Sequence, residues 1–138
     1  MTGKMSIVLF SGTVDKLMPI GILASGAVAM DMEVDIFATF WGLTAMRKDM
    51  LMTNMKISKD YEEMAGPMME LMKTKNVQPW FETLKKAKEI GTVRIHACAM
   101  TFDLMGLKKE DLADFVDDVV AVGEYVEIAR EAQITLFI

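Results

Sequence analysis

The sequence predicts an α/β fold built on a five-stranded, mostly parallel sheet with helices on both faces. Short apolar runs of strand composition alternate with helical segments along the whole chain, and no repeat, linker or low-complexity tract interrupts them. The chain has 138 residues, of which 52% are hydrophobic, so it can bury one substantial core. We therefore expect residues 1–138 to form a single domain, with the flavodoxin-like strand order 2-1-3-4-5.

Five segments have the composition of strands. The first, Ser6–Phe10, is a continuous apolar run that suits a strand covered on both faces. Each segment is rich in β-branched or aromatic residues and is followed by a turn or a helix start. The predicted strands are Ser6–Phe10, Glu33–Phe40, Thr92–Ala97, Val119–Val122 and Ile134–Ile138.

The segments between the strands predict helices. The longest contains small residues (Gly21, Ser25, Gly26, Ala27) that predict close packing on the sheet. Its apolar part, Leu17–Met30, is too short to cross a bilayer, which needs about 20 residues. Residues 44–57 are irregular and predict a loop or short turns. The predicted helices are Asp15–Met30, Ser58–Lys73 with an interruption at Gly66-Pro67, Pro79–Ile90, Thr101–Leu104 and Gly123–Ala132.

Composition excludes several classes of function. The net charge is −5 and no basic stripe is present, which disfavours nucleic-acid binding. The single cysteine cannot form an internal disulfide or a thiolate zinc cage, and the N-terminus lacks a secretory signal. We therefore expect a cytoplasmic protein without a membrane span, cofactor or metal. A mean hydropathy of +0.26 is high for a lone domain of this size and predicts a homo-oligomer.

Cys98 is the candidate functional residue, because it directly follows the third predicted strand and precedes a short helix. In the expected strand order it faces the turn after the first strand across the switch point, where ligands bind. Backbone donors at a helix start lower a thiol pKa, and a nearby lysine adds positive charge. A small buried hydrophobe is the equally weighted alternative for a free cysteine. The residues expected to stabilise an anion here are Ser11, Gly12, Thr13, Lys16, Ala99, Met100 and Thr101.

Other residues support less specific interpretations. His96 lies two residues before Cys98, and a satisfied core histidine is favoured over a base. The fifteen methionines allow a Cu(I) or redox-sensing module that uses the methionines of residues 46–55 with Cys98, but packing or a subunit interface explains them better. The acidic residues between 110 and 118 lack the pattern of a calcium loop. A structural oligomer with an inert Cys98 also remains open.

Three segments together resemble the DsrE/DsrF-like proteins, in particular the branch called peroxiredoxin-like. They are Phe10–Lys16, Phe37–Leu43 and Cys98–Leu107, and the later Val122–Tyr125 also fits. The resemblance covers nearly the whole chain. It implies a parallel α/β sheet, an oligomer, and a persulfide carried on Cys98, with Trp41 and Gly42 in an apolar cover.

The resemblance also implies partners and a chemistry. Members exchange sulfur with TusA-like sulfur carriers, rhodanese-like donors or small sulfane-sulfur compounds, as a sulfur carrier or a sulfurtransferase. A thiolate at Cys98 would take up sulfane sulfur and pass it to an acceptor thiol. Because some relatives have additional cysteines and this chain has one, a two-cysteine peroxidase mechanism is disfavoured.

Overall fold

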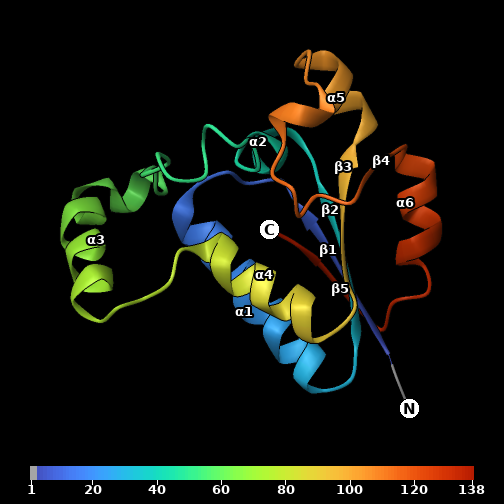
Figure 1. The fold of residues 1–138 in the computed structure, drawn as a ribbon, viewed down its shortest axis with the longest axis horizontal. Coiled ribbons are helices and arrows are strands. Elements are labelled where there is room, and N and C mark those ends of the chain that lie inside the picture. The colour runs from blue at the N-terminus through green and yellow to red at the C-terminus, as the bar shows by residue number, and fades with distance from the viewer. Residues whose placement is uncertain (1–2) are drawn as a thin grey trace.

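Five parallel strands form a central sheet in the computed structural model, which describes residues 3–138 (Figure 1). The strands are β1 (Lys4–Leu9), β2 (Glu33–Ala38), β3 (Val93–Cys98), β4 (Asp118–Val120) and β5 (Ile134–Phe137). The α-helices are α1 (Val14–Ala29), α2 (Phe40–Thr44), α3 (Ala65–Thr74), α4 (Trp80–Ile90), α5 (Ala99–Leu104) and α6 (Val122–Ala129). Two short 3₁₀ helices, η1 (Lys59–Met64) and η2 (Lys109–Asp111), complete the described elements.

The strand order is β4-β3-β2-β1-β5, so the expected order 2-1-3-4-5 is wrong. The chain moves in one direction across the sheet from β1 to β4, and only β5 returns to the far side of β1. Right-handed crossovers in one direction leave their helices on one face, and a reversed crossover leaves its helix on the other. Accordingly α1 and α4 cover one face, while α6 covers the other (Figure 1).

The main core lies between the sheet and the pair α1 and α4. Fully buried Ile7, Ile36 and Ile95 from three adjacent strands meet Leu17 of α1 and Leu84 of α4. Alternate residues of the same strands point to the other face. The expected helices on both faces are thus confirmed, and the elements differ from the predicted ranges mainly at their ends.

Two of the four small residues of α1, Gly21 and Gly26, do not make the close contact with the sheet that was expected. A Cβ atom at Gly21 would lie 2.9 Å from the Cβ of Thr83 and 3.1 Å from the carbonyl oxygen of Trp80, both on α4. Gly26 has no neighbour within 4 Å of such an atom. The glycine at position 21 therefore allows two helices on the same face to approach each other, rather than a helix to approach the sheet.

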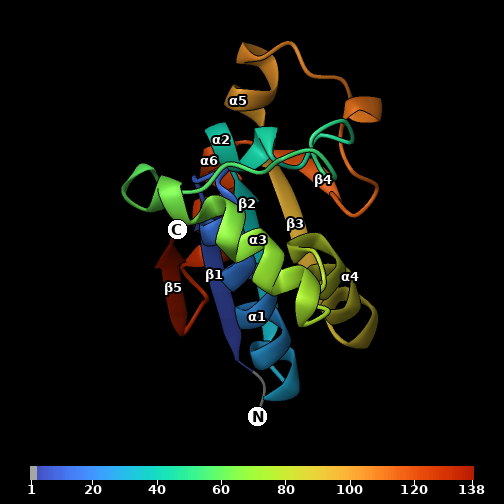
Figure 2. The same ribbon diagram turned by 90° about the vertical axis from the view of Figure 1, so that its left-hand side faces the viewer.

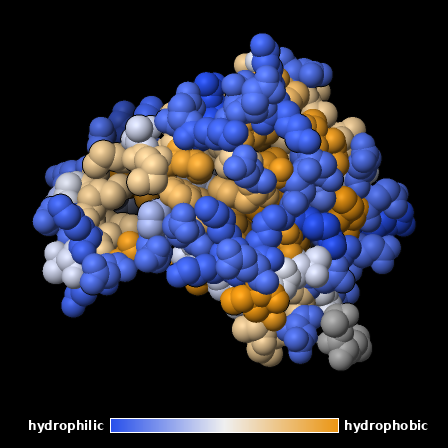
Figure 3. Space-filling model, in the orientation of Figure 1, coloured by the Kyte–Doolittle hydropathy of each residue, from blue (hydrophilic) through white to orange (hydrophobic). Residues whose placement is uncertain are grey.

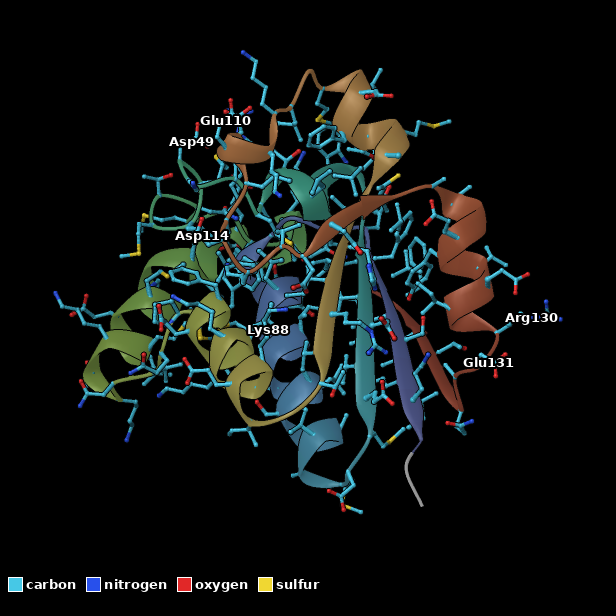
Figure 4. All side chains as sticks on the ribbon, turned by 45° about the vertical axis from the view of Figure 1, so that its right-hand side comes forward. Asp49, Lys88, Glu110, Asp114, Arg130 and Glu131 are labelled. Carbon is cyan, nitrogen blue, oxygen red and sulfur yellow. The ribbon has the colours of Figure 1, made fainter. Side chains whose placement is uncertain are left out.

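Figure 2 shows that the connections after β1, β2 and β3 gather at one end of the sheet, with α2 and α5 there. The segment with η1 and α3 lies apart from the sheet, and no residue of α3 is buried. Apolar surface extends over this part of the molecule (Figure 3). Lys88, labelled in Figure 4, joins α4 to β3 and the segment before β4: it donates to the carbonyl of Val93 at 2.9 Å and contacts Asp117 at 2.5 Å.

Alanine at Gly42 should destabilise the fold, because its Cβ would lie 2.3 Å from the carbonyl oxygen of Leu9. Relief requires a backbone shift in either β1 or α2, and we expect a loss of about 2–3 kcal/mol of unfolding free energy. Gly26→Ala is the matched control, because this exposed helical position is open and alanine should add roughly 0.5–1 kcal/mol. Urea unfolding measures both. Equal effects at the two positions would contradict the close contact at Gly42.

Candidate functional site

Cys98 is the last residue of β3 and directly precedes α5, whereas the predicted strand ended at Ala97 and the predicted helix began at Thr101. Its side chain lies on the face of the sheet that α6 covers, in a cluster with Phe37, Val120 and Tyr125. These neighbours leave only 7% of the residue exposed, so it is less open to solvent than expected. The rings of Phe37 and Tyr125 stack with their centroids 4.6 Å apart and form an apolar wall beside the thiol.

The pKa of the Cys98 thiol is nevertheless lowered. Burial acts to raise it, but hydrogen bonds from the backbone N–H groups of Thr101 and Met100 and from the hydroxyls of Thr101 and Thr39 outweigh that effect. All four donors favour the charged form of the sulfur. Of the expected backbone donors, Met100 and Thr101 act on the thiol and Ala99 is not among them, while the hydroxyls of Thr101 and Thr39 supply two more donors.

Thr39 is a contributor that the sequence analysis missed. Its hydroxyl lies 3.2 Å from that of Thr101, and the backbone N–H of Phe40 donates to the Thr101 hydroxyl oxygen at 3.1 Å. The Thr101 oxygen accepts this hydrogen bond, and the Thr101 hydroxyl proton can be donated to the sulfur of Cys98. Phe40 has a positive φ of 46°, which is rare for a bulky residue. The connection after β2 therefore places Thr39 and Phe40 beside the residues that follow β3.

The other predicted site residues lie around a different cavity, which we call the lysine pocket. It has a volume of about 610 Å³. Cys98 is not among its lining residues, and Gly42 packs against Leu9 instead. The residues that line it are Ser11, Gly12, Thr13, Lys16, Trp41, Thr44, Ala45, Met50, Asn54, Lys56, Ser58 and Lys59.

The strand order explains this separation. The predicted order placed the first strand beside the third, so the turn after it would have faced Cys98. In the structure β2 lies between β1 and β3, and β1 has β5 as its other neighbour. The switch point is therefore between β1 and β5, where the N–H groups of Phe10 and Ser11 donate to the carbonyl of Ile138. α2 lies between Cys98 and the lysine pocket, since its Phe40 contacts Thr101 beside the cysteine while its Trp41 lines the pocket.

His96 is a satisfied core histidine, as favoured from the sequence. Its Nδ1 lies 2.6 Å from an oxygen of Asp118, and its Nε2 lies 2.8 Å from an oxygen of the fully buried Asp35. Arg94 binds both oxygens of Asp35 and also Glu33. Both ring nitrogens are thus occupied by carboxylates, so His96 has no nitrogen left to act as a base for Cys98.

Within this ionic cluster the charges stabilise one another. Burial acts to raise the pKa of Asp35, but hydrogen bonds from His96 and Arg94 hold it well below its usual range. Burial acts to lower the pKa of His96, yet its two carboxylate partners raise it overall. The hydrogen bonds that Arg94 donates to Asp35 also raise the pKa of Arg94. The cluster ties β2, β3 and β4 together on the face that carries Cys98.

The raised pKa of His96 predicts a pH-dependent stability. A protonated His96 contributes fully below the unfolded-state pKa of about 6.5, and this contribution is lost as the pH rises through the higher folded-state pKa. Urea unfolding between pH 6.5 and 9 should therefore show falling stability in the wild type and a flatter profile in His96→Gln. Parallel profiles would contradict the charged state of His96.

The methionines of residues 46–55 do not gather around Cys98. Met46 is fully buried in the main core, whereas Met52 and Met55 are exposed. A separate cavity between α1 and α3 is lined by Met18, Met64, Met68, Met69 and Met72 among other residues. A Cu(I) site formed by the methionines of residues 46–55 together with Cys98 is therefore not present in this arrangement of the described residues. Among the described residues, no group of three or more His, Cys, Asp or Glu side chains is placed to hold a metal, and no helix is long and apolar enough to cross a membrane.

Comparison with known proteins gives consistent results. A sequence profile of the DsrE/DsrF/DrsH-like family matches residues 1–71 and 50–137. The uncharacterized protein YrkE of Bacillus subtilis is 38% identical, covering 99% of this chain and 98% of its own length. The sulfur carrier protein DsrE2 of Allochromatium vinosum is 30% identical and covers 98% of each chain.

Two solved structures share the fold. A protein of unknown function from Methanobacterium thermoautotrophicum, MTH1491, aligns with a TM-score of 0.60 at 18% identity over 99% of each chain. The ychN protein of E. coli aligns with a TM-score of 0.52 at 15% identity over the full length of both. At these identities the structural likeness concerns the fold alone.

Proposed function

This chain belongs to the DsrE/DsrF/DrsH-like family, and on that premise we propose that it carries sulfane sulfur as a persulfide on Cys98. The observation that carries the proposal is the set of hydrogen-bond donors at the cysteine, which lower the pKa of its thiol despite burial. The relative from Allochromatium vinosum that is named a sulfur carrier supports the same chemistry.

The transfer needs no redox partner. The Cys98 thiolate attacks the outer sulfur of a donor persulfide, R–S–SH, and a new S–S bond forms while the donor S–S bond breaks. The donor leaves as the thiolate R–S⁻ with the electron pair, and Cys98 becomes Cys98–S–SH. With thiosulfate the leaving group is sulfite. An acceptor thiolate then attacks the outer sulfur, which regenerates the Cys98 thiolate and completes either a carrier or a sulfurtransferase cycle.

The donors around Cys98 have a role in each step. The N–H groups of Met100 and Thr101 and the hydroxyls of Thr39 and Thr101 stabilise the attacking thiolate before transfer. When Cys98 is the leaving group, the same donors stabilise it again. Phe37 and Tyr125 limit access of water to the persulfide. In this proposal Ser11, Gly12, Thr13, Lys16, Trp41 and Gly42 do not touch the sulfur.

Partners must reach a thiol that is largely covered. Two exposed side chains lie near it: Met100 follows Cys98 by two residues in α5, and Val122 begins α6 two residues after Val120 of the cysteine cluster. A TusA-like carrier or a rhodanese-like donor would dock on this surface, whereas small sulfane-sulfur compounds need only a small opening. Val126 of α6 and Phe137 of β5 are also exposed and apolar. We propose that this face contributes to a homo-oligomer, which light scattering of the purified protein measures.

Intact mass spectrometry tests the proposed function. Reduced protein is exposed to polysulfide or thiosulfate, and the wild type should gain one or more sulfur atoms that reductant removes. Cys98→Ser should gain none, because the chain has no other cysteine. An unmodified wild type whose Cys98 reacts with an alkylating agent would overturn the proposal.

A further inference from the structure

The lysine pocket is a concentration of positive charge in an acidic protein. Lys16, Lys56 and Lys59 line it, and no carboxylate is among its lining residues. None of the three lysines forms an ion pair within residues 3–138, although the chain carries a net charge of −5. Uncompensated charge of one sign in a cleft attracts ligands of the opposite sign. The electrostatics of this pocket therefore favour an anion.

One carboxylate, Asp15, borders the pocket, because its hydrogen-bond partner Ser58 is a lining residue. Asp15 accepts a hydrogen bond from the backbone N–H of Ser58 at 3.1 Å and one from the Ser58 hydroxyl at 2.5 Å. Asp15 lines the neighbouring methionine-lined cavity and not the lysine pocket. Burial acts to raise the pKa of Asp15, but these hydrogen bonds lower it overall, so Asp15 stays charged. The three lysines that line the pocket outnumber this one bordering carboxylate.

The loop that carries two of the lysines is fixed by hydrogen bonds. The Asn54 side-chain amide donates to the carbonyl of Gly12 at 2.8 Å, and the backbone N–H of Lys56 donates to the Asn54 side chain at 3.1 Å. The N–H of Val14 donates to the carbonyl of Lys56 at 2.7 Å. The first N–H of α1 is thus already paired, and the attraction for an anion comes from the lysines. A site held in this way loses little entropy when it binds a ligand.

Part of the pocket lining is apolar. Trp41 is 54% exposed and lines the cavity with Ala45 and Met50. A volume of about 610 Å³ is much larger than a single inorganic anion needs and is in the range of sites for small organic ligands. A ligand with an aromatic ring against Trp41 and a negatively charged group near the lysines would complement both kinds of lining residue.

From these observations we propose that the lysine pocket binds an organic phosphate that carries an aromatic group. The phosphate contacts Lys16, Lys56 and Lys59, and the aromatic group packs on Trp41. Because Cys98 does not line this cavity, the site does not depend on the proposed persulfide chemistry. It is a second binding site, on the other side of α2 from the thiol.

Tryptophan fluorescence of the full chain tests this site, with ADP as the probe. Trp41 is exposed in the pocket whereas Trp80 is buried in the core, so quenching that is lost in Trp41→Phe reports the pocket. We expect saturable quenching by ADP, weaker binding of inorganic pyrophosphate measured by calorimetry, and no binding of adenosine. Lys16→Gln combined with Lys56→Gln should weaken ADP binding at least tenfold.

The matched control is Lys86→Gln, an exposed lysine on α4 that lies outside the pocket and forms no ion pair within residues 3–138. It should leave ADP binding unchanged. The proposal is overturned if ADP does not bind at millimolar concentration, if the double lysine variant binds as well as the wild type, or if pyrophosphate binds as tightly as ADP. Each of these results is independent of whether Cys98 takes up sulfur.

Discussion

Thr101→Val should slow sulfur uptake by Cys98 about tenfold at neutral pH. Valine has nearly the same shape as threonine but lacks the hydroxyl that helps to lower the pKa of the thiol. A hydrogen bond to a charged group contributes about 1.5–3 kcal/mol, and 1.4 kcal/mol corresponds to a tenfold change in thiolate population. The rate of mass gain with polysulfide, measured across a range of pH, gives the effect. Raising the pH should restore much of the lost rate.

Thr101→Ser is the matched control, because it retains the hydroxyl and should react at nearly the wild-type rate. Thr101→Val also leaves the N–H of Phe40 without its acceptor, which costs about 1–3 kcal/mol of stability. Circular dichroism therefore checks that both variants are folded. Thr39→Val should shift the pH profile in the same direction, since its hydroxyl also lowers the pKa of Cys98. Rates that are unaffected by loss of either hydroxyl would exclude these donors from the chemistry.

Asp35→Ala should lower the unfolding free energy by about 3–5 kcal/mol. Asp35 is fully buried and binds Arg94, His96 and, at 3.7 Å, Lys4. Its removal leaves several positive groups on one face of the sheet without their shared partner. A loss of this size is a large fraction of the stability of a typical domain. Urea unfolding at pH 7 measures it.

Glu33→Gln is the matched control for this prediction. Glu33 also binds Arg94, at 2.8 Å, but it is partly exposed, and exposed ion pairs contribute about 0–1 kcal/mol. The lowered pKa of Asp35 also predicts how the unfolding free energy changes with pH. Its stabilisation should be present above the unfolded-state pKa of about 3.9 and lost as the pH falls through the lower folded-state value. Similar losses in the two variants would contradict a central role for Asp35.

The sequence was a good guide to the elements of this fold but not to their order. Periodicity and composition identified the five strands, and the three central ones, β1, β2 and β3, are the buried apolar runs expected of parallel strands. The strand order depends on which face each crossover helix takes, and the decisive contact is the close approach of Gly21 to α4. A small residue in a helix predicts close packing without saying whether a sheet or another helix is the partner.

Only the part of the candidate site that is adjacent to Cys98 in the sequence could be predicted. Cys98 and the backbone donors that follow it are adjacent in sequence, so the strand-to-helix boundary indicated them. Thr39 comes from the connection after β2, and its position beside Thr101 follows from the pairing of β2 with β3. The same pairing moved Ser11 and Lys16 away from the thiol. His96 was identified as a core residue, but its partners Asp35 and Asp118 lie on the neighbouring strands.

The pH dependence of Cys98 alkylation tests the activation of this thiol most directly. Iodoacetamide is a small neutral reagent, and with one cysteine in the chain each added mass reports the same sulfur. We expect the rate for the folded protein to rise with a midpoint below that of the same protein unfolded in urea, where the thiol has its ordinary pKa of about 8.5. A folded-state midpoint equal to or above the unfolded one would contradict a thiolate stabilised by the residues around α5.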